Sequence, residues 1–285
     1  MNEQFPQSNQ ELQPSSPRKP EVTHPAPDHQ TPNWRRLEVA SRYLRDRVTD
    51  GISQATEAQT DISSDTARCI AYPLGRSLGP NSTLGDYSQT AAGNYEALRD
   101  EYLQFYNNPE APDWVVEQIN WLGSHLIRSA FPQAKTSSYG EQYPPTLRRM
   151  LVPTQMQLGV QALTAHVPGS FDSAGISKIE SNLIRLGADE NPRLQAFLAL
   201  PDTDAASQCL VECYEESFAG EFEDIKDLIH ATIDLDEHER EVTQFAADRF
   251  LYFDYINPDY EALGAEVRRL VDVVERGGRF YAFYK

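Results

Sequence analysis

Two cysteines have a spacing at which metal chemistry is possible. Cys209 and Cys213 lie four residues apart in a segment with helical periodicity, so both thiols can face one metal ion. A zinc site needs two further ligands, and the sequence has no second cysteine pair and no suitably spaced histidines. We therefore expect Cys209 and Cys213 to be small core residues rather than ligands.

Two Asp and His pairs also have helical spacing, as in carboxylate-bridged metal sites. They are Asp227 with His230 and Asp234 with His238. Such a site needs two facing Glu-x-x-His elements and two further glutamates, which this chain lacks. The histidines form no set with a serine or cysteine nucleophile, and no glycine-rich phosphate loop occurs. The sequence therefore predicts no enzyme, no metal and no cofactor.

The most informative pattern is instead a concentration of carboxylates. Between Asp202 and Glu261 there are 18 Asp and Glu residues against Lys226, Arg240 and Arg249, a net charge of −15. A compact unit the size of residues 201–285 is about 30 Å across. Duplex DNA of that length carries about 18 negative charges, at one per about 1.7 Å of axis. The segment therefore has a charge comparable to that of DNA, although a salt-adapted acidic surface has the same composition.

The periodicity of this segment places its acids on solvent faces. Leu210, Cys213 and Tyr214 share one helical stripe, and Ile225 and Leu228 belong to a second. The carboxylates that lie off these stripes, or follow them, are the predicted partner-binding residues: Glu212, Glu215, Glu216, Glu221, Glu223, Asp224, Asp227, Asp234, Asp236, Glu237, Glu239, Asp254, Asp259 and Glu261.

The overall charge limits the classes of partner. The chain of 285 residues has a net charge of −18, and 40% apolar residues are sufficient for real cores. An acidic surface repels nucleic acid and anionic membranes and attracts proteins with basic surfaces. Three cysteines without regular spacing indicate a reducing compartment, and no signal peptide or membrane span is recognisable. We expect a cytoplasmic protein that binds neither nucleic acid nor membranes.

The elements that must position these residues suggest an α+β fold, as an elongated multi-domain chain of small α/β units around a helical middle region. Cys69–Leu74 reads as a strand and 158–167 as helical, and the spacing of Ile176, Ile179 and Leu183, and then Leu194–Leu200, predicts further helices. Asn257-Pro258 reads as the start of a helix whose apolar positions run from Tyr260 to Val274, and Arg279–Tyr284 as a final strand. The expected domains are a disordered Pro/Gln-rich arm (1–32), a short helix and linker (33–66), an N-terminal α+β domain (67–130), a linker and helical middle domain (131–200), and an acidic C-terminal α+β domain (201–285).

Five arginines fall within the helix predicted from Trp34 to Val48. Such a cluster can contact nucleic acid, but acidic residues are interspersed with it. A solvated helix face is therefore the favoured interpretation.

The order of these segments resembles a known family. IAYPLGRSLGPNSTLGDYSQ, a helix and APDWVVEQINWLG resemble the first domain of ArdA-type antirestriction proteins. FAGEFEDIKDLIHATIDLD, followed by NPDYEALGAEVRR and GGRFYAF, resembles the C-terminal domain of that family. The likeness covers residues 67–285 and is strongest from Phe218 onward.

The resemblance implies a non-enzymatic DNA mimic from a mobile element, which evades host defence by occupying the DNA-binding groove of type I restriction-modification enzymes. It also implies a homodimer formed through the C-terminal region. The alternative from the residues themselves is an acidic interaction or regulatory module that binds another basic partner, such as a transcription factor.

Overall fold

The computed structural model describes residues 31–133, 143, 145–251 and 258–285. In this part of the chain it is a mixed α+β structure with 12 α-helices and five strands, mostly helical in its N-terminal half. The predicted α+β class is confirmed. The predicted disordered arm lies outside the described residues except for its last two positions, and the domain boundaries remain predictions.

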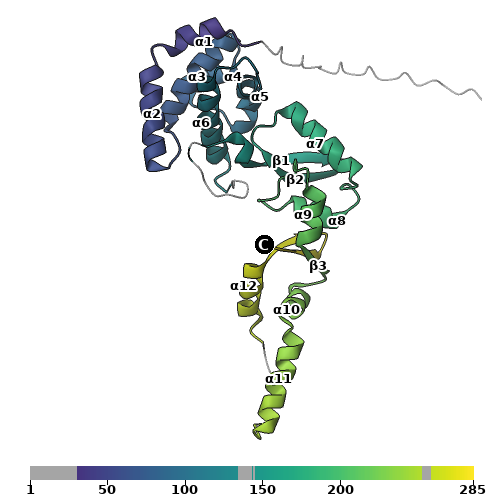
Figure 1. The fold of residues 1–285 in the computed structure, drawn as a ribbon. Helices are drawn as coiled ribbons and strands as arrows, with labels where there is room; N and C mark the ends of the chain where they lie inside the picture. The colour runs from purple at the N-terminus through teal and green to yellow at the C-terminus, as the bar shows by residue number, and fades with distance from the viewer. Residues whose placement is uncertain (1–30, 134–142, 144, 252–257) are drawn as a thin grey trace, which may run out of the picture. The chain divides into compact units, whose positions relative to one another are not determined.

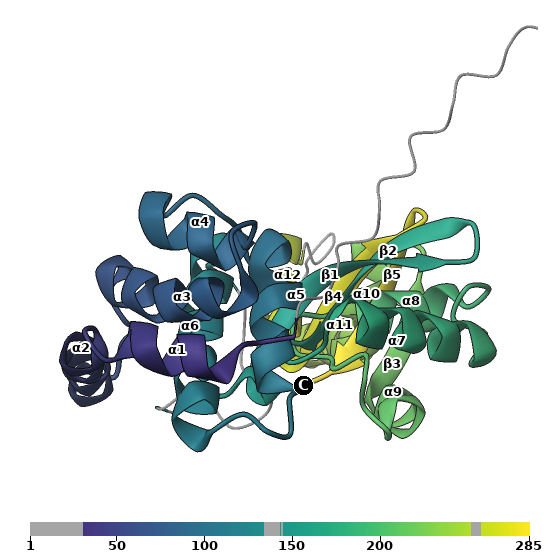
Figure 2. The ribbon, with the colours of Figure 1, turned by 90° about the horizontal axis from the view of Figure 1, so that it is seen from above.

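The N-terminal half of the described chain is a group of six helices around one core (Figure 1). Trp121, Tyr102 and Phe105 are among its largest fully buried side chains. Figure 2 shows the same grouping from above. The helices are α1 (Trp34–Ser41), α2 (Arg45–Ala58), α3 (Ser64–Leu78), α4 (Thr83–Thr90), α5 (Tyr95–Tyr106) and α6 (Asp113–Ala130).

The strand predicted from Cys69 to Leu74 is wrong, because these residues lie inside α3. Ser63 starts this helix by accepting a hydrogen bond from the backbone N–H of Thr66. Most of α3 is buried, even at Pro73 in its interior. A helix that is buried on several sides shows a continuous apolar run, which periodicity cannot distinguish from a buried strand. The segment 67–130 is therefore all helical rather than α+β.

The helix predicted for residues 158–167 is also wrong. This segment forms the turn and second strand of an antiparallel hairpin of β1 (Leu151–Leu158) and β2 (Gln161–Pro168). Leu158 pairs with Gln161, so the turn consists of Gly159 and Val160. Gly159 has φ of 61°, which only glycine adopts readily, and Val160 is fully exposed.

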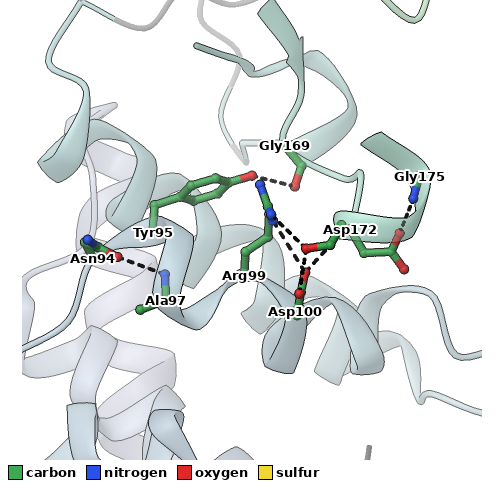
Figure 3. A network of polar contacts seen from close by, with 9 residues as sticks. Asn94, Tyr95, Ala97, Arg99, Asp100, Gly169, Asp172 and Gly175 are labelled. Carbon is green, nitrogen blue, oxygen red and sulfur yellow. Dashed lines mark hydrogen bonds and ion pairs between the residues drawn. The ribbon is translucent and has the colours of Figure 1, made fainter. Parts of the chain in front are cut away.

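The hairpin is followed by α7 (Ser173–Arg185) and α8 (Pro192–Leu198), as the helical patterns predicted. A polar network joins α7 to α5 (Figure 3). The carboxylate of Asp100 accepts hydrogen bonds from the N–H and hydroxyl of Ser173 at 3.1 and 2.7 Å. Arg99 donates to the same hydroxyl at 2.9 Å. These contacts tie the helical group to the segment that follows the hairpin.

The C-terminal part contains a three-stranded antiparallel sheet in the order β3-β5-β4. On the central strand, Tyr281 and Phe283 pack into a core with Phe197 of α8, while Ala282 packs on the opposite side with Leu228 of α10. This alternation follows the period of two in a strand. The elements are α9 (Leu210–Ser217), β3 (Phe218–Phe222), α10 (Ile225–Ile233), α11 (Leu235–Asp248), α12 (Tyr260–Leu270), β4 (Val271–Arg276) and β5 (Arg279–Tyr284).

The final strand is confirmed, but the last helix is shorter than its apolar pattern suggested. Asp259 caps α12, two residues after the predicted cap Asn257, which lies outside the described residues. The helix ends at Leu270, and Val274 belongs to β4. No helix among the described residues is long and apolar enough to cross a membrane.

Candidate functional site

The carboxylates of α9 are exposed on the side of the helix away from its core contacts. Leu210 is buried and Tyr214 packs between the rings of Phe197 and Phe218. These anchors leave the other side of α9 in solvent, where Glu212, Glu215 and Glu216 lie. Side chains three or four residues apart on a helix are about 5–6 Å from each other. The predicted placement of these three acids is confirmed.

The start of α10 carries a second group of exposed acids, Glu223, Asp224 and Asp227. Asp224 is the N-cap, and its Oδ1 accepts hydrogen bonds from the backbone N–H groups of Lys226 and Asp227 at 2.7 and 2.9 Å. Acidic groups are favourable at the positive end of a helix. Local helix physics therefore accounts for part of this charge.

The junction of α10 and α11 holds a further group. Asp234 is exposed and has φ of 48°, the left-handed conformation that ends α10. Asp236 Oδ1 lies 2.7 Å from Nδ1 of His230, whose Nε2 lies 3.0 Å from the hydroxyl of Tyr260. Glu237 is exposed as well.

The remaining predicted residues differ in their surroundings. Asp259 caps α12, accepting from Glu261 N–H at 3.2 Å, and both side chains are exposed. Glu239 is half-buried. Asp254 lies outside the described residues.

Glu221 is set apart from the other predicted carboxylates by its arginine partners. Its two carboxylate oxygens lie 2.8 Å from Arg193 and 2.7 Å from Arg279, and its side chain is 17% exposed. The hydrogen bonds from Arg193, and then from Arg279, lower the pKa of Glu221 below its usual 4.5. Its charge is thereby compensated within the molecule. Glu221 serves to join α8 to the sheet and contributes little negative charge to an external partner.

The three cations of the acidic segment do not offset its carboxylates. Lys226 lies over the ring of Tyr260 at 5.0 Å and Arg249 over the ring of Phe245 at 3.9 Å. Arg240 donates to the backbone carbonyl of Asp236 at 3.2 Å. Within the described residues, no ion pair links any of these cations to a carboxylate of the segment. The exposed acids therefore form no ion pair with these three cations, although Asp236 contacts His230.

The interpretation of Cys209 and Cys213 as core residues is wrong, because both are exposed. Their Sγ atoms lie 3.4 Å apart. No group of three or more His, Cys, Asp or Glu side chains is positioned to hold a metal ion in the described ranges. The pairs Asp227–His230 and Asp234–His238 belong to no such group; His230 instead contacts Asp236.

The structure also brings together basic residues that sequence reasoning placed on a solvated face. Arg35, Arg36 and Arg47 line one groove with Arg68 and Arg76, which lie about thirty residues further along the chain. The sequence signal was the cluster of arginines after Trp34, and only the packing of α1 on α3 supplies the rest of the groove.

Comparison of the chain with protein family models, curated proteins and solved structures finds no match.

Proposed function

We propose that this protein is an antirestriction DNA mimic that occupies the DNA-binding groove of type I restriction-modification enzymes. It acts by competition and catalyses no reaction. The proposal rests on the resemblance of residues 67–285 to ArdA-type proteins and on the charge of the C-terminal part. We also propose that the protein is elongated in solution, and small-angle X-ray scattering tests this shape.

The observation that carries the proposal is the exposure of carboxylates, on and beside successive helices, that form no ion pair with the lysine and arginines of the acidic segment within the described residues. Eleven of the fourteen predicted residues are exposed, and they are distributed over α9, α10, α11 and α12. A basic groove gains affinity for DNA chiefly by neutralising phosphates and releasing counterions. Carboxylates about 5–6 Å apart on helices offer comparable spacing to the same cations. No base is read, so one mimic blocks enzymes with different recognition sequences.

The direct test mixes the purified protein with a type I restriction-modification enzyme and unmodified DNA. We expect both cleavage and methylation to fall as the protein is titrated in, because both reactions require the enzyme to bind DNA. Raising the salt concentration should weaken the inhibition, since the contact is electrostatic. Full cleavage at low salt with excess protein would exclude this function.

A matched control separates the acidic helices from net charge alone. The test variant changes six exposed acids to amides: Glu212, Glu215, Glu216, Glu223, Asp224 and Asp227. The control variant makes six equivalent changes in the N-terminal helical group and its connections, at the exposed residues Asp46, Asp50, Glu57, Glu96, Glu110 and Glu117. Only the first variant should lose inhibition. Equal losses of inhibition in the two variants would indicate that only the net charge matters. That result would favour the alternative, an acidic module that binds some other basic partner.

The homodimer implied by the resemblance is part of the proposal, and its contact lies away from β5. Both edges of β5 are hydrogen-bonded, to β3 and to β4, so this strand is not free to pair with a second copy. The contact proposed instead is formed by Val242 and Phe245, which are exposed apolar residues of α11. Sedimentation should give a dimer for the native protein and a monomer for the variant Val242→Asp/Phe245→Asp. A dimer that survives these changes would place the contact elsewhere.

A further inference from the structure

A basic groove lies between α1, the start of α2 and α3, at the opposite end of the sequence from the acidic helices. Its volume is about 1120 Å³, slightly above the usual range of ligand sites, which is roughly 300–1,000 Å³. The arginines that line it are Arg35 and Arg36 of α1, Arg47 of α2, and Arg68 and Arg76 of α3. We call this site the basic groove.

Its positive charge is only partly compensated inside the molecule. Among the lining residues that the structure describes, Asp65 is the one acidic side chain, and it is shared between Arg47 at 3.7 Å and Arg68 at 3.8 Å. Arg68 is held in place by the backbone carbonyls of Ser88 and Gln89, both 2.9 Å away. The groove therefore has a fixed cation in its wall and an excess of four positive charges, in a chain whose net charge is −18.

Two of the arginines occupy an electrostatically unfavourable place. Arg35 and Arg36 lie in the first turn of α1, which contains no acidic residue. Cations are disfavoured at the positive end of a helix, where an anion is stabilised instead. Neither side chain has an ion pair within the described part of the chain, and the same holds for Arg76. An anion bound in the groove would neutralise the arginines and the helix end together.

Two tyrosines of the lining are exposed in a way that a solvated face does not require. The side chain of Tyr43, between α1 and α2, is 91% exposed, and that of Tyr72, on α3, is 41% exposed. Aromatic rings next to guanidinium groups stack nucleobases while the arginines contact phosphates. A purely acidic peptide would use the arginines but would leave these rings without a function.

We propose that the basic groove binds a short stretch of single-stranded nucleic acid, with phosphates on the arginines and bases on Tyr43 and Tyr72. A duplex keeps its bases stacked inside the helix and therefore offers no free base face to the tyrosines. The acidic segment does not prevent this binding, because exposed charges are largely screened beyond about 8 Å at physiological salt. This proposal departs, at this one site, from the expectation from composition that the protein avoids nucleic acid.

The test measures binding of the 285-residue protein to a fluorescein-labelled single strand of about 12 nucleotides by anisotropy, over a range of salt concentrations. The variant Arg35→Gln/Arg36→Gln/Arg76→Gln should bind more weakly, and the slope of log affinity against log salt should fall by about 2, as expected when three phosphate contacts are lost. Tyr43→Ala and Tyr72→Ala should each weaken binding about tenfold without changing the slope. A duplex of the same length should bind more weakly than the strand.

The control variant is Arg42→Gln/Arg45→Gln/Arg148→Gln, which removes the same charge at exposed arginines outside the groove lining. It should bind the strand as the native protein does. Equal loss in the control, no binding at low salt, or binding that is indifferent to both tyrosines would each overturn the proposal. Displacement of the strand by equimolar ATP would overturn the proposal and assign the groove to a free nucleotide. Displacement only by polyglutamate would overturn it as well and assign the groove to an acidic protein. The variant with six neutralised acids should retain strand binding, so this inference and the antirestriction proposal fail independently.

Discussion

The Sγ atoms of Cys209 and Cys213 lie 3.4 Å apart at the exposed start of α9. The pKa of Cys209 is lowered chiefly by the hydroxyl of Ser207, which lies 3.1 Å from the Cys209 sulfur, and next by the thiol of Cys213. The contact between the two sulfurs raises the pKa of Cys213, because the Cys213 thiol donates its hydrogen bond to the Cys209 thiolate. The two thiols therefore differ in reactivity, although they are four residues apart.

We expect Cys209 to react first with iodoacetamide near neutral pH, since the thiolate is the nucleophile. Peptide mapping by mass spectrometry identifies the modified residue. Ser207→Ala should slow the reaction of Cys209, whereas buried Cys69 should remain unmodified in all cases. Faster alkylation of Cys213 would contradict the assignment.

Single changes in the acidic helices should have little effect on inhibition of a type I enzyme. Each exposed carboxylate contributes about 1 kcal/mol or less, so a single change removes only a small part of the total. Glu216→Gln and Asp224→Asn should therefore inhibit almost as the native protein does, and asparagine preserves the α10 cap. The change of all six acids should weaken inhibition by about 3 kcal/mol or more in competition assays. Complete loss from one change in a folded protein would indicate a localised site instead.

Glu221→Gln should destabilise the fold, because it removes the carboxylate shared by Arg193 and Arg279. The pKa of Glu221 is lowered in the folded state, so its ionised form stabilises the protein above pH 4.5, the usual value for glutamate. This stabilisation is lost as the pH falls through the lower, folded-state pKa. Urea unfolding should show a gap between the native protein and the variant at pH 7 that narrows below pH 4.5. Glu241→Gln, at an exposed position of α11, is the control and should show no such gap.

Deletion of residues 279–285 should unfold the C-terminal sheet, since it removes the strand between β3 and β4. Tyr281 and Phe283 leave the core that contains Phe197, so α8 and α9 should lose protection as well. Hydrogen exchange should show retained protection in α3 to α6, whose core is separate. Protection of β3 and β4 in the truncated protein would contradict the observed strand order.

Gly75→Ala should be destabilising by about 1–3 kcal/mol, because α3 and α4 cross closely at this residue. A Cβ atom on Gly75 would lie 2.3 Å from the backbone nitrogen of Gly85, so the two helices would have to separate. Gly264→Ala is the matched control within α12: its Cβ would meet no atom closer than 3.6 Å. The control should be neutral or slightly stabilising in thermal unfolding, since alanine favours a helix by roughly 0.5–1 kcal/mol over glycine.

The sequence by itself determined the local features of this protein. The concentration of 18 acids in 202–261 is a property of composition, and the apolar positions Ile176, Ile179 and Leu183 predicted α7 through their spacing. The apolar residues of Arg279–Tyr284 predicted the final strand in the same way. The prediction of α7 succeeded because that helix has one clearly apolar side, and that of β5 because a short apolar run directly follows the turn residues Gly277 and Gly278.

Tertiary structure decided the features that depend on distant residues. Cys69–Leu74 was predicted as a strand because α3 is covered by its neighbours on several sides. Its apolar residues therefore form a continuous run that shows no helical period. Residues 158–167 fold as a hairpin because β2 finds its partner in β1, and propensity alone does not specify strand pairing. Glu221 lost its expected free charge to arginines 28 and 58 residues away. The basic groove likewise exists only where α1 packs on α3, because side-chain proximity between separate helices is set by packing and not by local sequence.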